Sequence, residues 1–220
     1  MGNFDIAQIM QGLAVGAVPV LFAITLHEVA HGLAARHFGD RTAEMLGRLS
    51  LNPIKHIDPV GTVVVPALMF ITSGFLFGWA KPVPVAFQNL RNPKRDMIFV
   101  ALAGPVANIV MGIGWALILK LALVFGLVAV TPDGFLFRMV EIGILINALL
   151  AAINLIPIPP LDGGRVLRGL VNESIGQYLD RIEPFGFIII VVLLVSGLLW
   201  VVVDPLRNFL TSLILFVVRL

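Results

Sequence analysis

The sequence contains no cysteine. This absence excludes a fold held together by disulfide bonds, and it also excludes metal sites built from thiolates. Any metal that the chain binds must therefore be held by the nitrogen and oxygen atoms of histidine, aspartate or glutamate. Redox arguments leave the cellular compartment open.

Charged residues are also scarce. Only 13% of the 220 residues are Asp, Glu, Lys or Arg, whereas 59% are hydrophobic and the mean hydropathy is +1.00. Soluble domains have about 25% charged residues, so the composition indicates an integral membrane protein in contact with the lipid bilayer. The formal net charge of +2 is too small to suggest a nucleic-acid partner, and the composition leaves the oligomeric state open.

Long uncharged stretches predict an all-α polytopic membrane protein with four to six transmembrane helices, because backbone groups in lipid must pair within their own segment. The apolar runs predict helices at 6–36, 97–127, 136–157 and 184–203, and a shorter apolar tail follows at 206–220. About 20 helical residues are needed to cross a hydrocarbon core of about 30 Å, so the tail is short for a span. No repeat or linker divides the chain, and we expect a single domain over residues 1–220.

Residues 60–80 form a further uncharged run that does not resemble a transmembrane helix. The run contains glycines, a proline and many β-branched residues, and basic residues lie on both sides of it. A crossing here would export half of these basic residues, whereas positive flanks normally stay in the cytoplasm. The sequence therefore predicts a re-entrant or β-like segment, embedded in the membrane, near residues 41–85. The same rule places the end of the first helix and the residues near 162 on the cytoplasmic side.

The first predicted helix carries the metal-binding pattern HExxH, with His27, Glu28 and His31. Histidines four residues apart project from one face of a helix and can occupy adjacent corners of a zinc tetrahedron. Glu28 follows the first histidine and is placed to accept a proton from a metal-bound water. Ionisable groups within a membrane are costly and usually functional, which argues against a chance match. The pattern needs a third ligand.

We expect the third ligand in the stretch NLIPIPPLDGGRVL, residues 154–167. Asn154 ends an apolar helix, the prolines that follow prevent its regular continuation, and Asp162 precedes two glycines that free the backbone. Asp162 could alternatively cap the N-terminus of a new helix, a frequent role for aspartate. The need for an oxygen ligand on the same side of the membrane favours a metal ligand.

Four motifs together resemble the site-2 protease family of intramembrane zinc metalloproteases, peptidase family M50. They are HEVAH at 27–31, GWAKPVPV at 78–85, AGPVAN at 103–108 and the stretch that contains Asn154 and Asp162. They occur in the family's order, and the similarity covers roughly residues 10–175. The chain is similar to compact members of the family that lack a PDZ or CBS domain.

The resemblance implies a role for each motif residue. His27, His31 and Asp162 would bind one Zn²⁺ per chain, and Glu28 would be the catalytic base. Asn154 would position the substrate or stabilise the tetrahedral intermediate. The segment around 60–85 would lie along the site and hold the substrate in an extended form. The expected substrates are single-span membrane proteins, and the expected location is a bacterial-type cytoplasmic membrane with the active site toward the cytoplasm.

Two other functions stay open at this point. One is a membrane metal-binding or transport protein that uses the same ligands without hydrolysis, although a transporter should carry polar residues along a path to both faces. The other is a catalytically silent relative, although a silent scaffold has no need of Glu28 within lipid.

Three further polar residues have open roles. Asn108 lies in an apolar helix after Gly104 and Pro105, and it is a candidate to bond a neighbouring helix or the site. His56 is a candidate to support a metal ligand or to be a plain surface histidine. We expect His37 to lie at the membrane interface.

Overall fold

The computed structural model describes residues 6–65, 68, 81–126 and 134–220, and the described residues are largely helical with no β-strand. The long helices are α1 (Ile6–His37), α4 (Pro93–Val124), α5 (Phe135–Asn154) and α9 (Leu198–Val218). The shorter ones are α2 (Thr42–Met45), α6 (Asp162–Leu170), α7 (Glu173–Ile182) and α8 (Gly186–Val195). Single turns lie at Pro53–His56, Pro59–Val64, Phe87–Asn89 and Glu183–Phe185. The predicted all-α fold is confirmed.

Four helices in the described part of the chain are long and apolar enough to cross a membrane. They are Val15–His37 within α1, and the helices α4, α5 and α9. Three of them match predicted spans to within a few residues at each end. The chain is therefore a multi-pass membrane protein.

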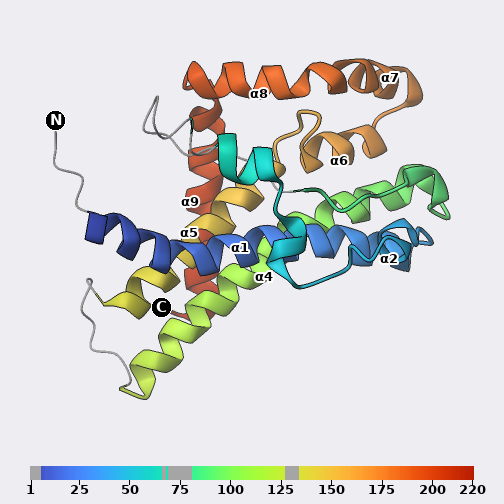
Figure 1. The fold of residues 1–220 in the computed structure, drawn as a ribbon. Coiled ribbons are helices and arrows are strands. Elements are labelled where there is room, and N and C mark those ends of the chain that lie inside the picture. The colour runs from blue at the N-terminus through green and yellow to red at the C-terminus, as the bar shows by residue number, and fades with distance from the viewer. Residues whose placement is uncertain (1–5, 66–67, 69–80, 127–133) are drawn as a thin grey trace.

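The predicted span at 184–203 is wrong. The helix α8 ends at Val195, and the chain turns at Gly197, whose φ is +78°. Glycine adopts this left-handed conformation without steric cost, so the direction of the chain changes here. Figure 1 shows α8 lying across the molecule and α9 descending from its end. Hydropathy does not reveal the break because apolar residues continue on both sides of it.

The span that replaces it is α9, which includes the tail at 206–220. Its charged residues Asp204 and Arg207 lie inside the helix and pair one turn apart at 3.2 Å. The tail at 206–220 is short for a span by itself, and whether it crosses was left open; it is the second part of α9.

The helices α1, α4 and α5 pack against one another, and α9 packs against α4 and α5 (Figure 1). Small residues allow this close approach. A Cβ atom on Gly143 of α5 would lie 2.5 Å from the ring of Trp115 in α4, so the glycine makes room for the indole. Alanines fill the centre of the core, with Ala116, Ala148, Ala151 and Ala152 fully buried. The three motif-bearing helices are thereby held in direct contact.

The region 41–85 contains helical turns in its described part. Asn52 and Asp58 cap two of these turns by accepting hydrogen bonds from backbone N–H groups two or three residues ahead. Residues 81–86 adopt no regular secondary structure and belong to no β-sheet. The β-like character predicted for this region is therefore not found in its described part. Residues 66–67 and 69–80, which make up most of the uncharged run at 60–80, lie outside the described residues.

Candidate metal centre

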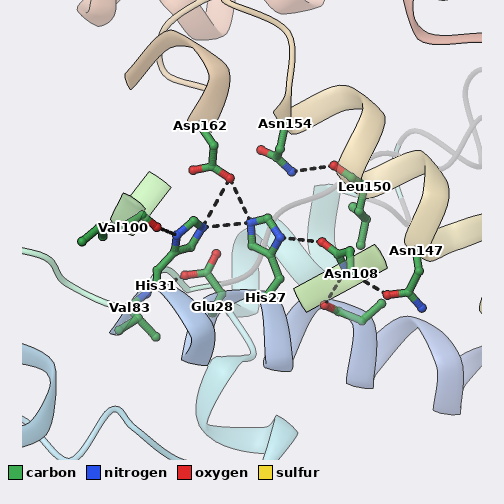
Figure 2. A network of polar contacts seen from close by, with 11 residues as sticks. His27, Glu28, His31, Val83, Val100, Asn108, Asn147, Leu150, Asn154 and Asp162 are labelled. Carbon is green, nitrogen blue, oxygen red and sulfur yellow. Dashed lines mark hydrogen bonds and ion pairs between the residues drawn. The ribbon is translucent and has the colours of Figure 1, made fainter. Parts of the chain in front are cut away.

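His27, His31 and Asp162 meet between α1 and the start of α6, and all three are buried (Figure 2). The Nε2 atoms of the two histidines are 3.1 Å apart. The Oδ2 atom of Asp162 lies 3.2 Å from Nε2 of His27 and 3.3 Å from Nε2 of His31. Ligand atoms on a tetrahedral zinc, each about 2.0–2.1 Å from the ion, are about 3.3 Å apart. The three atoms therefore form a triangle of the size that a zinc ion requires.

Asp162 is the first residue of α6, and it does not act as the N-cap. The N-cap residue is Leu161, and no side chain caps this helix. A Cβ atom on Gly163 would lie 2.4 Å from the carbonyl oxygen of Ile156, so this glycine lets α6 start in close contact with the preceding turn. The backbone turn directs the carboxylate toward α1. The alternative reading of Asp162 as a helix cap is therefore not supported.

The tautomer of His27 follows from its partner Asn108 in α4. The amide nitrogen of Asn108 donates to Oδ1 of Asn147 at 2.9 Å and to the carbonyl oxygen of Ala23 at 3.1 Å, so the other amide atom is the acceptor. Nδ1–H of His27 therefore donates to Oδ1 of Asn108, at 2.6 Å. The remaining nitrogen, Nε2, presents a lone pair to the triangle. Figure 2 shows this chain of side chains across three helices.

His31 is oriented in the same way by a backbone group. Its Nδ1–H donates to the carbonyl oxygen of Val100 at 2.7 Å, and a carbonyl can only accept. Both Nε2 lone pairs then face the carboxylate of Asp162, whose buried Oδ2 has no hydrogen-bond donor. Three electron-pair donors that face one another without a proton between them fit a bound cation, and the donor set of two imidazoles and one carboxylate suits zinc.

Gly104 in α4 makes room for the two imidazoles. A Cβ atom at this position would lie 2.4 Å from Nε2 of His31 and 2.6 Å from Cε1 of His27. The motif AGPVAN thus supplies two features of the site. Gly104 leaves room for the imidazoles, and Asn108, about one turn later, accepts the hydrogen bond from His27.

Glu28 lies beside the histidines, and Figure 2 shows its carboxylate next to the two imidazoles. Its Oε2 accepts a hydrogen bond from the backbone N–H of Val83 at 2.7 Å. The contact brings the motif GWAKPVPV to the site through residues 81–85, which are the described part of this motif.

Asn154 is the last residue of α5, and its amide donates to the carbonyl oxygen of Leu150 in the same helix at 3.0 Å. In Figure 2 its side chain lies beside that of Asp162. The role predicted for Asn154 in substrate positioning stays a prediction.

The remaining polar residues take other places. Asn108, whose role was open, supports the site. Asn147 was not singled out by the sequence reading, although a second asparagine inside an apolar helix was a usable signal. His56 is 2% exposed, and its Nε2–H donates to the carbonyl oxygen of Ser50 at 2.8 Å, away from the three ligands. His37 is exposed at the end of α1.

Comparison with known proteins gives the family. The family model described as "Peptidase family M50" matches residues 124–197. A protein of Bacillus subtilis named "Putative zinc metalloprotease YwhC" is 37% identical over 193 residues, which are 87% of this chain and 84% of that protein. A protein of Mycolicibacterium smegmatis named "Putative zinc metalloprotease Rip2" is 35% identical over 179 residues, and the alignment covers 80% of this chain but only 64% of that protein. No solved structure matches the chain. On the extent of the similarity to the Bacillus protein, the chain belongs to peptidase family M50, the site-2 protease family of zinc metalloproteases.

Proposed function

We propose that the protein is a zinc-dependent endopeptidase that hydrolyses peptide bonds within the transmembrane segments of other membrane proteins. The observation that carries the proposal is the buried triangle of His27, His31 and Asp162, because the two histidines lie in α1, a helix long and apolar enough to span a bilayer. A metalloprotease site at this place meets its substrate inside the membrane.

His27, His31 and Asp162 would hold one Zn²⁺ per chain. When bound, this ion supplies a Lewis acid that polarises a carbonyl group and lowers the pKa of a bound water from 15.7 to about 7. The protein's part is to hold the ligands in place, through Asn108 for one imidazole and the Val100 carbonyl for the other.

Glu28 is the proposed general base. Its carboxylate lies next to the two imidazoles and is half-buried, so it can accept a proton from the attacking water and later give this proton to the leaving amine. Asn154 is the proposed donor to the developing oxyanion, for which its amide would exchange the Leu150 carbonyl for the substrate. Loss of one such donor at comparable sites costs about 10²–10³ in rate.

The proposed substrates are single-span membrane proteins. A substrate helix already satisfies its own backbone hydrogen bonds, so it must unwind before a carbonyl group becomes accessible. Segments with glycine or proline unwind most easily and are the expected cleavage sites. The positive-inside rule supports a cytoplasmic membrane with the site toward the cytoplasm, from which water reaches it.

The proposal is tested by cleavage of single-span fusion proteins in proteoliposomes, by the parent protein and two glutamine variants. Glu28→Gln removes the proposed base, and Glu141→Gln makes the same chemical change at an exposed glutamate of α5. We expect cleavage by the parent and by Glu141→Gln, and none by Glu28→Gln, which should keep its zinc. Equal cleavage by Glu28→Gln would exclude it as the base.

A further inference from the structure

The carboxylate of Glu28 is held by one backbone group from a distant segment. Residues 81–86 read KPVPVA, and the prolines at 82 and 84 have no N–H to donate. Val83 lies between them, is 6% exposed, and donates its N–H to Oε2 of Glu28 at 2.7 Å. The described residues supply no hydrogen bond to the other carboxylate oxygen. The proline pattern thus leaves a single N–H at this point, and that N–H meets the proposed base.

The surface of α1 is shaped to receive Val83. Gly32 lies one helical turn after Glu28, and a Cβ atom on Gly32 would lie 2.8 Å from Cγ1 of Val83 and 2.4 Å from Cδ2 of Leu49. Val83 therefore packs into space that exists only because residue 32 has no side chain. This packing and the hydrogen bond to Glu28 fix the same residue of the segment.

Asp40 anchors the other end of the segment. It lies just beyond α1 and is 1% exposed. Its carboxylate accepts hydrogen bonds from the N–H of Ala86 at 2.7 Å, from the N–H of Thr42 at 3.0 Å and from the amide of Asn89 at 3.2 Å. Burial alone raises the pKa of Asp40, but these hydrogen bonds and one from the Thr42 hydroxyl outweigh it and lower the pKa. Asp40 is thus an anion that ties the 81–86 segment to the end of the helix that carries Glu28.

The segment between the two contacts is short and stiff. Only Pro84 and Val85 lie between Val83 and Ala86, and the φ angle of Pro84 is fixed by its ring. On the other side, the N–H of Lys81 donates to the carbonyl oxygen of His56 at 2.9 Å. Loss of Asp40 should therefore loosen the segment at Ala86 and at Val83 without detaching it altogether.

We propose that Asp40 is a positioning residue for catalysis. It fixes the 81–86 segment so that the N–H of Val83 holds one oxygen of Glu28, and the other oxygen stays free for the proton transfer. Asp40 touches neither the substrate nor the three metal ligands. The inference rests on the proposed role of Glu28 as general base. The orientation of a catalytic group matters because a misplacement of about 1 Å can cost about 10²-fold in rate.

The first test measures structure and needs no substrate. Hydrogen–deuterium exchange of the zinc-loaded protein in detergent is compared for the parent, Asp40→Ala and Asn172→Ala. The control Asn172→Ala also removes a side chain that accepts a backbone hydrogen bond, at the start of α7. We expect faster exchange of the Val83 amide in Asp40→Ala only. Unchanged exchange at Val83 in Asp40→Ala would overturn the proposal.

The second test measures kinetics on a purified single-span protein whose apolar segment carries glycine, asparagine and proline. We expect Asp40→Ala to lower kcat by about 10- to 100-fold, with KM and zinc content unchanged. Asp40→Asn keeps one acceptor oxygen and should restore part of kcat. A loss of zinc, a change confined to KM, or no change in kcat would each overturn the proposal.

A double-mutant cycle tests whether Asp40 acts through Val83. Val83→Pro removes the N–H and replaces the valine side chain by an apolar ring of similar size. If Asp40 acts through this N–H, adding Asp40→Ala to the Val83→Pro variant should lower kcat by less than about twofold further. If the two substitutions act independently, their losses in kcat would multiply, and this result would contradict the inference. If Asp40→Ala does not fold, Asp40→Asn takes its place in the cycle. Absence of Glu28-dependent cleavage by the parent would instead count against the proposed function, and the exchange measurement would still decide the contact between Asp40 and Val83.

Discussion

Replacing Asn108 by alanine should weaken zinc binding more than it weakens the fold. Asn108 is fully buried, and its Oδ1 is the acceptor for Nδ1–H of His27 at 2.6 Å. Alanine removes this acceptor, so the imidazole is free to rotate or to place its proton on Nε2, which the metal needs as a lone pair. Loss of a group that orients a metal ligand typically costs about 10–100-fold in metal affinity, or about 1.4–2.7 kcal/mol.

The cost to the fold is expected to be smaller. Two buried groups lose their partner, Nδ1–H of His27 and Oδ1 of Asn147, and the carbonyl oxygen of Ala23 loses the bond that it accepts beside its helical one in α1. Hydrogen bonds between transmembrane helices are worth about 0.6 kcal/mol on average, so about 1 kcal/mol is expected for the two. Asn147→Ala is the matched control, because it removes a buried asparagine of the same network but leaves the bond between Asn108 and His27.

Zinc affinity is measured in detergent by competition with a chelator of known affinity, and stability is measured separately by thermal unfolding of the zinc-free protein. We predict a loss of 10-fold or more in zinc affinity for Asn108→Ala and a clearly smaller loss for Asn147→Ala. Unchanged zinc affinity in a folded Asn108→Ala protein, or equal losses in both variants, would refute the argument from the His27 tautomer.

Three further substitutions test separate parts of the structure. Gly104→Ala places a Cβ atom 2.4 Å from Nε2 of His31, so zinc content by metal analysis should fall, and a full zinc content would contradict the packing described. Gly197→Ala should destabilise the protein by about 1–2 kcal/mol in thermal unfolding, because alanine adopts the positive φ of this turn at a cost; no loss would mean that the turn is not required. Because the folded state lowers the pKa of Asp40, its stabilising effect is complete above the unfolded value of about 3.9 and is lost as the pH falls through the lower folded value. In Asp40→Asn, the free energy of unfolding should therefore fall less steeply as the pH is lowered below about 3.9. An unchanged dependence on pH would exclude this contribution of the Asp40 carboxylate.

Three of the spans and the two histidines of the site follow from local sequence. His27 and His31 share one helix face by their spacing alone, and the apolar runs mark three spans closely. Asp162 required more than spacing, since an aspartate before two glycines also suits a helix cap. The need for an oxygen ligand on the same side of the membrane favoured a metal ligand, and the resemblance to the family implied the same role.

Other features depend on how helices pack, which local sequence does not show. The link from His27 to Asn108 and Asn147 joins three helices, and the contact of Val83 with Glu28 joins residues 55 positions apart. The break at Gly197 lies in an apolar run and leaves no trace in hydropathy. In the same way, the capped turns at 53–56 and 59–64 arise from side chains of Asn52 and Asp58 in a stretch whose β-branched residues favour a strand.

The central claim is that zinc and Glu28 cut a peptide bond inside the membrane. The most direct measurement is mass spectrometry of the products of a single-span substrate in proteoliposomes, after removal of metal by a chelator and after zinc is restored. The account predicts a cut within the apolar segment that disappears with the metal, returns with zinc, and is absent in Glu28→Gln. A cut confined to residues outside the bilayer, or one that persists without metal or without Glu28, would contradict it.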